Sequence, residues 1–396
     1  MKVAFLTAGG IAPCLSSSIG ALIGEYNKLA PNIEMIGYLN GYRGLLLGNS
    51  IKFPNSVKTN YNRLYDYGGS PIGNSRVKLT NIEDCVQNGY VKNGQDPLTV
   101  AAEQLKIDNI DILHTIGGDD TNTMAAQLSF YLKNNGYDLT VVGLPKTIDN
   151  DVYPISQTLG AYTAAEQGAI FFENIVNENT TSTRQLIIHE IMGRNCGWLT
   201  AYTAYYYRDR MKNKSFIPEL LIDEKRWDID AIYIPELDFN FEDEITRLRK
   251  RMDDKDCVNI FLSEGAGIET IVREMENNGE AIPRDAFGHV RLDEINPGQW
   301  FASQFSGRLK AKKTLVQKSG YFARSAKPNN RDLQLIKESA KFAAEFALDN
   351  KNGVVGRDIE NQNKLGLINF DRIKGGKHFD YNEKWFIKIL GEIKQK

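Results

Sequence analysis

Residues 117–121 read Gly-Gly-Asp-Asp-Thr, and residues 145–151 read Pro-Lys-Thr-Ile-Asp-Asn-Asp. Each segment follows an apolar run, 110–116 and 139–144, which is the pattern of a buried strand that ends in a turn. Glycines at such a turn let the backbone approach a phosphate, and carboxylates there suit Mg²⁺ binding or proton transfer. The two segments together predict a phosphate site at the ends of strands in an α/β fold.

Strand-like runs alternate with helical patterns along most of the chain. The runs that predict strands are 3–7, 33–39, 110–116, 139–144, 185–191, 231–234, 258–262 and 365–370. The patterns that predict helices are 16–29, 97–105, 121–132, 161–177, 197–207, 242–252 and 268–277. This alternation indicates parallel sheets with helices on both faces, and ligands beyond the carboxyl ends of the strands.

Composition excludes some classes of function. The chain has 396 residues with 48 Lys and Arg against 50 Asp and Glu, so no net basic charge would recruit nucleic acid. The four cysteines lie far apart without a CxxC spacing, which predicts free thiols. His114 and His189 stand in strand-like runs and are interpreted as core or lining residues. The chain shows no apolar stretch long enough to span a bilayer and no leader pattern, so we expect a cytoplasmic protein.

Two glycine-rich turns and an acidic pair are candidates for binding a phosphoryl donor. Gly9 and Gly10 follow the first strand, and the segment 68–76 holds three glycines before Arg76, whose guanidinium suits a phosphate. Asp119 and Asp120 follow a strand as adjacent carboxylates. One of them could simply cap the next helix, but that reading explains only one. Asp119 is the candidate on the metal side.

The remaining candidates suit a sugar phosphate acceptor. Asp149 is the candidate general base for a hydroxyl, with Asp151 to orient it, although both could be turn residues. The segment 192–194 (Met-Gly-Arg) and Glu264 also end strands, where an arginine suits a phosphate and a glutamate suits sugar hydroxyls. Each of these alone could equally be a salt-bridged surface residue.

An ordered set of motifs resembles the phosphofructokinase family over residues 3–325. The motifs are TAGGIAPCLSSSIGAL, GGSPIGNSR, TIGGDDTN, GLPKTIDND, IMGRNCGW, LSEGAG and GYFARSA. The resemblance implies two Rossmann-like α/β domains with parallel sheets and the active site in the cleft between them. It also implies Mg²⁺ and transfer of a phosphoryl group to the 1-hydroxyl of fructose 6-phosphate, giving fructose 1,6-bisphosphate.

The resemblance also implies roles for individual residues. The catalytic residues are Asp149, Lys146, Thr147 and Arg194; the donor is bound by Gly10, Arg76, Asp120 and Lys146; and Asp119 is on the metal side. The acceptor is contacted by Thr147, Ile148, Asp149, Met192, Gly193, Arg194, Glu264, Tyr321 and Arg324. The donor and metal domain is expected at 1–157, completed by part of 280–325, the sugar-phosphate domain at 158–325, and a covering extension at 326–396.

Asp120 and Lys146 resemble the pair that marks the pyrophosphate-using members of the family, where ATP-using bacterial members have glycines. A carboxylate at the first position adds bulk and charge where the α-phosphate of a nucleotide would lie. Two unit charges about 4 Å apart repel by about 4 kcal/mol at an effective dielectric constant of about 20. The prediction is therefore pyrophosphate as donor, phosphate as product and a reversible reaction, with Lys146 treated as the partner of Asp120.

Three alternative functions remain beside this interpretation, and the sequence departs from the family's pattern at two places. The alternatives are an ATP-dependent phosphofructokinase, a lipid or NAD kinase, and an inactive sugar-phosphate-binding regulatory subunit; the last should have lost Asp149 or Asp119. The family is usually dimeric or tetrameric, and a homodimer is expected here. Arg184 is the candidate that would reach the sugar phosphate of a neighbouring subunit, although its spacing differs from bacterial members. The stretch 289–298 replaces the family's usual arginine-containing stretch, and no role is assigned to it.

Overall fold

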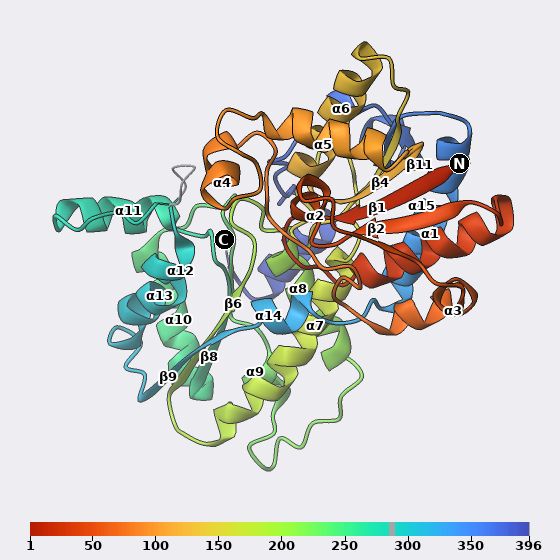
Figure 1. Ribbon diagram of the computed structural model, residues 1–396. Coiled ribbons are helices and arrows are strands. Elements are labelled where there is room, and N and C mark those ends of the chain that lie inside the picture. Colours follow the sequence, from red (N-terminus) through yellow and green to blue (C-terminus); the bar gives the residue numbers. More distant parts are fainter. Residues whose placement is uncertain (285–289, 396) are drawn as a thin grey trace. The chain divides into compact units, whose positions relative to one another are not determined.

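The computed structural model describes residues 1–284 and 290–395, without the side chain of Asp293. The chain forms two compact units, which are coloured by sequence in Figure 1. Unit 1 contains residues 1–163 and 324–377, and unit 2 contains residues 164–323 and 378–396. His289, part of the stretch 289–298 that had no assigned role, lies outside the described residues.

These boundaries differ from the predicted ones. The first falls at 163/164, inside helix α7 (Ala161–Ile175), and not at residue 157. The chain returns to unit 1 with 324–377 and not with part of 280–325. The reason is that helix α15 (Asn330–Leu348) packs on the sheet of unit 1 and strand β10 (Gly353–Asp358) is part of that sheet. The C-terminal stretch therefore belongs to both units.

Unit 1 is built on a seven-stranded sheet in the order β11-β10-β5-β4-β1-β2-β3. Its central strands are parallel, as predicted, but β11 and β3 at the edges run antiparallel to their neighbours. The bounds not yet given are β1 Lys2–Thr7, β2 Glu34–Tyr38, β3 Ser50–Lys52, β4 Ile112–Gly117, β5 Thr140–Pro145 and β11 Lys364–Ile368.

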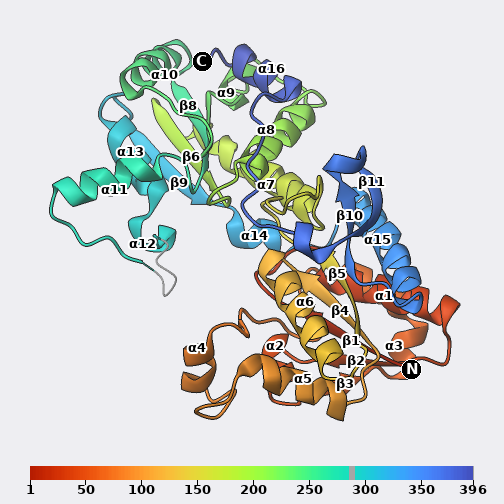
Figure 2. The ribbon, with the colours of Figure 1, turned by 90° about the horizontal axis from the view of Figure 1, so that it is seen from above.

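Helices cover both faces of this sheet. In Figure 2, α1 and α15 lie on one side of the strands and α5 and α6 on the other. On the side of α5 and α6, the strands and helices enclose an apolar cluster. It includes Leu6, Leu113 and Leu128, all fully buried. The helix bounds in unit 1 are α1 Leu15–Leu29, α2 Tyr42–Leu46, α3 Asn55–Thr59, α4 Ile82–Gln87, α5 Pro97–Ile107 and α6 Asp119–Asn134.

Unit 2 has a four-stranded parallel sheet in the order β7-β8-β6-β9. The strands are β6 Gln185–Ile191, β7 Ala231–Tyr233, β8 Cys257–Ser263 and β9 Lys313–Lys318. The helices after α7 are α8 Trp198–Met211, α9 Glu224–Trp227, α10 Phe241–Lys255, α11 Ile268–Asn277, α12 Leu292–Ile295, α13 Pro297–Ser306, α14 Gly320–Arg324 and α16 Lys384–Glu392.

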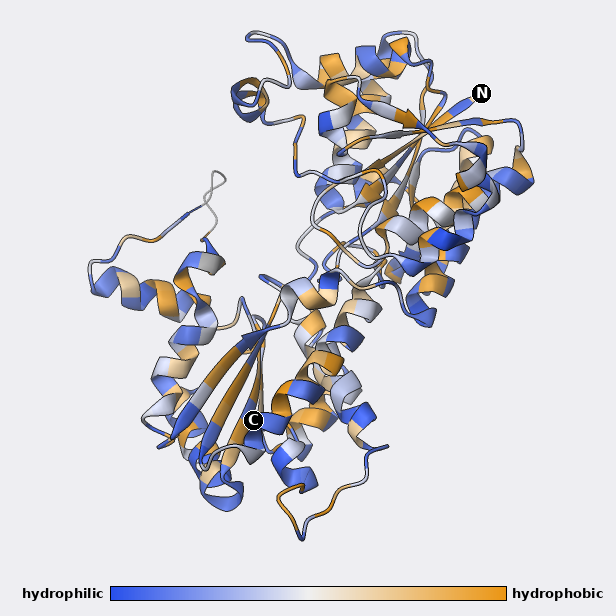
Figure 3. Ribbon diagram, turned by 60° about the horizontal axis from the view of Figure 1, so that its bottom comes forward, coloured by the Kyte–Doolittle hydropathy of each residue, from blue (hydrophilic) through white to orange (hydrophobic). Residues whose placement is uncertain are grey.

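The cores of the two sheets explain why the apolar runs predicted strands. β4, β5, β6 and β8 are buried along their whole length. Figure 3 shows hydrophobic residues, in orange, along strands of the four-stranded sheet. His114 and His189 are fully buried and packed against aromatic rings, so the interpretation as core residues is confirmed. All four cysteines are free and buried, as predicted. Among the described helices, none is long and apolar enough to cross a membrane.

Candidate active site

Two glycine-rich turns of unit 1 lie side by side at the carboxyl end of β1. The Gly9 amide donates to the carbonyl of Ser75 over 2.9 Å, and Asn74 Nδ2 donates to the carbonyl of Gly9 over 2.5 Å. Gly9 has φ of +88°, which favours glycine. A Cβ on Gly10 would lie 3.8 Å from Nη2 of Arg76. The predicted donor residues Gly10 and Arg76 are therefore neighbours.

Lys146 enters the same turn from the end of β5. Its Nζ donates to the carbonyl of Gly10 over 2.5 Å, and Lys146 is only 4% exposed. Burial lowers the pKa of Lys146 to about 8; the nearby Arg76 also lowers it, while Asp149 and Asp151 oppose the shift. A buried ammonium held at a glycine turn is suited to bind an anion that approaches this turn.

The acidic pair begins helix α6. Gly118 is the N-cap and both Asp119 and Asp120 lie in the first turn, so neither carboxylate caps the helix from outside. Burial raises the pKa of Asp119, and the neighbouring carboxylates of Asp120 and Asp151 raise it further. Negative side chains in the first turn are favourable to the helix dipole. Asp119 is therefore a partly buried carboxylate that is repelled by the negative charges of two nearby carboxylates.

Asp120 does not pair with Lys146. Its Oδ2 lies 2.6 Å from Nζ of Lys78, and the side chain of Asp120 is 60% exposed. The prediction that Lys146 is the partner of Asp120 is therefore wrong, because Lys146 is directed to the Gly10 carbonyl. Sequence reasoning missed Lys78, which stands two residues after the predicted Arg76 and could have been considered as a second cation of that loop.

The segment after Lys146 is braced by short polar side chains. The amide of Asp149 donates to Oγ1 of Thr147 over 3.1 Å. Asn150 adopts φ of +57°, and its side chain bonds the backbone of Ser156 and Thr158. Ile148 is buried. This bracing fixes the backbone that carries Asp149, which a general base requires.

In unit 2, the turn after β6 meets the turn after β8. Gly193 has φ of +129°; its amide lies 3.4 Å from Oε1 of Glu264, and its carbonyl accepts from Oγ of Ser263 over 2.6 Å. A Cβ on Gly265 would lie 1.7 Å from the Arg194 carbonyl, so this contact requires glycine. Burial raises the pKa of Glu264. The predicted residues Gly193, Arg194 and Glu264 are thus brought together.

Arg194 borders a polar cavity of about 760 Å³ in unit 2. The other charged residues that line it are Glu236, Asp238, Glu269 and Arg273, with His378 from the C-terminal stretch. Met192 packs against Gly320, at 3.0 Å from the position of a Cβ there, so the helix that carries Tyr321 begins beside it. Tyr321 is 76% exposed. Arg324 falls just inside the part of unit 1 that starts at residue 324.

Comparisons with known proteins show the family of this chain. A sequence model described as "Phosphofructokinase" matches residues 2–347. The chain belongs to the phosphofructokinase family. The pyrophosphate–fructose 6-phosphate 1-phosphotransferase of Methylotuvimicrobium alcaliphilum is 55% identical over 394 residues, which cover 100% of this chain and 96% of that protein. A protein of the same name from Mastigamoeba balamuthi is 54% identical, covering 99% of this chain and 96% of its own length.

A solved structure also supports the phosphofructokinase fold. The pyrophosphate-dependent phosphofructokinase from Marinobacter aquaeolei aligns with a TM-score of 0.70 at 20% sequence identity. The alignment covers 98% of this chain and 91% of that one. The family resemblance drawn from the motifs and the α/β fold class are therefore confirmed, and the roles assigned to single site residues stay predictions.

Arg184 makes several contacts within its own chain. Its guanidinium donates to Asp253 Oδ1 over 2.8 Å and to the carbonyls of Leu309 and Lys310. These bonds lie at the amino end of β6, whereas Arg194 follows the carboxyl end of the same strand. Within this chain the guanidinium of Arg184 is therefore held at the opposite end of β6 from Arg194. Its role at the site of a neighbouring subunit stays a prediction.

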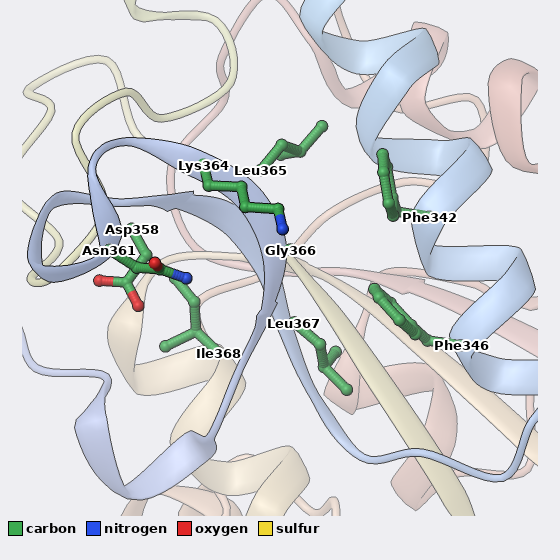
Figure 4. Close-up of a pocket in the computed structure, with 9 residues that line it drawn as sticks. All are labelled: Phe342, Phe346, Asp358, Asn361, Lys364, Leu365, Gly366, Leu367 and Ile368. Carbon is green, nitrogen blue, oxygen red and sulfur yellow. The ribbon is translucent and has the colours of Figure 1, made fainter.

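A second cavity, in unit 1, contains none of the predicted site residues. It measures about 330 Å³ and lies between α15 and the β10–β11 hairpin. Figure 4 shows Phe342 and Phe346 of α15 on one side and Leu365 and Leu367 of β11 facing them. Its lining combines aromatic and aliphatic side chains with Asp358, Asn361 and Lys364. Because it holds none of the predicted phosphate-binding residues, it is a poor candidate for phosphoryl transfer.

The carboxylates of unit 1 fit one kind of metal site. Among the described residues, no three or more His, Cys, Asp or Glu side chains form a group that could hold a metal ion alone. Mg²⁺ that is carried by a diphosphate needs only one or two protein carboxylates, with waters and phosphate oxygens as its other ligands. Asp119, beside Asp120 and Asp151, meets that requirement.

Proposed function

We propose that this chain transfers a phosphoryl group from pyrophosphate to the 1-hydroxyl of fructose 6-phosphate, releasing phosphate. The observation that carries the donor assignment is the buried Lys146 at the Gly10 carbonyl, together with Asp120 in the first turn of α6. The high identity to full-length pyrophosphate–fructose 6-phosphate 1-phosphotransferases supports the same reaction.

At the donor end, the glycine turn and two cations receive the diphosphate. Backbone amides near Gly9 and Gly10 approach the phosphate oxygens, while Lys146 and Arg76 balance the charge that develops as the phosphoryl group leaves. We propose Asp119 as a ligand of Mg²⁺, which when bound would neutralise the phosphate charge and orient the donor. The carboxylate of Asp120 occupies space that a nucleotide donor would need.

Asp120 can oppose ATP binding by its negative charge and by the bulk of its side chain, and the structure favours the second. The charge of Asp120 is 60% exposed and lies 2.6 Å from Lys78, so water and a cation reduce its repulsion of a phosphate. The bulk of the side chain is unaffected by either. Selection against ATP should therefore rest more on occupied space than on the full charge repulsion expected from the sequence.

At the acceptor end, Asp149 takes the proton of the 1-hydroxyl as the phosphoryl group arrives. Thr147 holds the Asp149 amide, and Arg194 and Arg324 bind the 6-phosphate, for which planar guanidinium groups give paired hydrogen bonds. Met192, Gly193 and Ile148 shape the acceptor site, and Glu264 and Tyr321 contact the sugar.

The experiment that tests the function compares initial rates with pyrophosphate and with ATP at equal fructose 6-phosphate. Pyrophosphate should support turnover and ATP should not. The reverse reaction, fructose 6-phosphate formed from fructose 1,6-bisphosphate and phosphate, should also be detected. Comparable kcat/KM values for the two donors would refute the donor assignment, and absence of reverse flux at high phosphate would refute reversibility.

We also propose a homodimer in the cytoplasm that serves glycolysis and gluconeogenesis. Four free, buried cysteines suit a reducing compartment. In the loop between α8 and α9, Ile217, Leu220, Leu221 and Ile222 are 47%, 62%, 59% and 37% exposed. An apolar group of this kind is typical of a protein contact. Light scattering should give twice the chain mass, and a monomer with full activity would refute the dimer.

A further inference from the structure

The glycine pair Gly375-Gly376 belongs to a segment of the C-terminal stretch that returns to the donor end of unit 1. Lys374 and Tyr153 exchange two backbone hydrogen bonds of 2.8 and 3.0 Å. The amide of Lys377 donates to the carbonyl of Asp151 over 2.9 Å, and its Nζ donates to the carbonyl of Ile155 over 2.5 Å. The segment 374–377 is therefore anchored on the residues that directly follow Asp149.

Between these anchors, Gly375 lies against the carboxylate of Asp119. A Cβ on Gly375 would lie 2.1 Å from Oδ2 and 2.8 Å from Cγ of Asp119, a separation that real Cβ atoms do not show. Gly375 is not among the glycines with positive φ, so this close approach, and not backbone strain, is what requires a glycine. Gly376, in contrast, has φ of +75° and open space, as a turn residue does.

The contact joins Asp119, inside the part of the chain that the family model matches, to Gly375, which lies beyond it. The family match covers residues 2–347. Asp119 is itself the first residue of α6. The carboxylate at the start of α6 therefore lies against the backbone of the segment 374–377.

We propose that the segment 374–377 is a positioning element for the donor, in which Gly375 sets the place of the Asp119 carboxylate for a magnesium-bound diphosphate. The proposal rests on the proposed function, because it gives Asp119 the metal side of the donor. The absence of a side chain at 375 lets the segment approach while the carboxylate keeps its orientation. The anchor at Asp151 links this approach to the segment that carries Asp149.

The first test is Gly375→Ala, with Gly366→Ala as the matched control. Gly366 lies in β11 of the same C-terminal stretch, has no atom within 4 Å of its added Cβ, and is not among the glycines with positive φ. In Gly375→Ala the atom that must yield is the tip of the Asp119 side chain, so the fold should survive. A displacement of about 1 Å at a reacting site can cost about 10²-fold.

We expect Gly375→Ala to lower kcat with pyrophosphate about 10²-fold. The Mg²⁺ concentration for half-maximal rate should rise, with KM for fructose 6-phosphate within twofold. Calorimetric titration of magnesium pyrophosphate, without acceptor, should show weaker binding, and Gly366→Ala should behave as wild type. Turnover and binding within twofold of wild type in a folded Gly375→Ala variant would overturn the proposal.

A second test uses the unaltered chain and does not depend on turnover. Hydrogen–deuterium exchange with and without magnesium pyrophosphate should show protection of peptides that cover 117–121 and also of those that cover 374–377, with 364–368 unchanged. Protection at 117–121 alone would overturn the role of the segment and leave the proposed function intact. Protection at neither site, with no turnover of pyrophosphate, would refute the proposed function and the inference with it.

Discussion

Lys78 and Asp120 form an ion pair at the start of α6, with 2.6 Å between Nζ and Oδ2. The pair joins the second glycine-rich loop to the helix that carries the candidate metal carboxylate. It also holds the side chain of Asp120 in place, although 60% of that side chain is exposed. A residue that resembles a marker of donor choice is thus oriented by a lysine from another loop, and Lys146 has a separate contact with Gly10.

Replacing Lys78 should weaken binding of the phosphoryl donor without affecting binding of the acceptor. In Lys78→Met, Asp120 loses the cation that offsets its charge, so KM for pyrophosphate should rise about three- to fivefold, which is the scale of an exposed ion pair. KM for fructose 6-phosphate should stay constant. Lys106→Met is the control, because Lys106 pairs with Glu103 at 3.2 Å on the surface of the same unit. An equal rise of both KM values would contradict this role.

Removing both donor markers should admit a nucleotide. In Asp120→Gly with Lys146→Gly, space opens at the first turn of α6 and at the Gly10 carbonyl, and some ATP-dependent turnover should appear. Asp120→Gly alone removes the partner of Lys78 and leaves the Lys146 contact in place, so it should reduce the pyrophosphate rate without much gain with ATP. Rates with both donors measure this. A double variant that still rejects ATP would show that other residues exclude the nucleotide.

Lys146 should give the reaction an alkaline limit. Burial lowers its pKa to about 8, so the free enzyme carries the ammonium below that pH and loses it above. The kcat/KM for pyrophosphate, which reports the free enzyme, should therefore fall above about pH 8. Lys146→Arg keeps its charge at every accessible pH and should shift the fall upward. Because ionisation of pyrophosphate itself is common to both proteins, identical profiles would exclude Lys146 as the titrating group.

Asp332 should make the stability of unit 1 depend on pH. Its carboxylate accepts from the amide and Oγ1 of Thr163, and burial raises its pKa to about 6. The folded protein then binds this proton more tightly than the unfolded chain, so stability is fully present below about pH 4 and is lost as the pH rises to about 6. Relative to Asp332→Asn, wild type should lose on the order of 2 kcal/mol between these limits.

Urea denaturation of both proteins at several pH values measures this difference, with the surface substitution Asp349→Asn as control. Asparagine can still accept from the Thr163 amide, so Asp332→Asn should fold. A constant difference in the free energy of unfolding between wild type and Asp332→Asn from pH 4 to pH 7 would show that Asp332 does not titrate in this range.

The local pattern of apolar residues was sufficient to predict the strands whose ends carry the candidate site. β6 and α11 have the bounds predicted for them, because a continuous apolar run and a regular helical spacing are local signals. The loops at the ends of β1, β4 and β5 were found for the same reason. The antiparallel edge strands and the return of α15 and β10 to unit 1 depend on pairing between distant segments, which no local period records.

The difference between local signals and contacts of distant segments also separates the site residues that were predicted from those that were missed. Lys146 and Gly10 belong to motifs, and their contact agrees with the shared site expected for them. Lys78, Gly375 and the bonds of Arg184 depend on contacts with segments far along the chain. The guanidinium of Arg184 bonds Asp253 at the amino end of β6, a contact that residue type and spacing do not record.

Asp149 gives the most specific mechanistic prediction. If it accepts the proton of the 1-hydroxyl, Asp149→Ser removes an interaction made mainly in the transition state, and kcat should fall about 10²–10⁴-fold with little change in KM for fructose 6-phosphate. The Thr147 hydroxyl bonds the backbone amide and not the carboxylate, so the segment should keep its conformation in the variant.

The reverse reaction provides a control for Asp149, because the overall equilibrium is unaffected by the enzyme. Asp149→Ser should therefore slow both directions alike, whereas Arg324→Ala should mainly raise KM for fructose 6-phosphate by removing a guanidinium from the 6-phosphate. Initial rates in both directions and a melting curve measure these effects. If Asp149→Ser keeps kcat within a few-fold of wild type, Asp149 is not the base, and Asp151, whose carbonyl binds the amide of Lys377, becomes the next candidate.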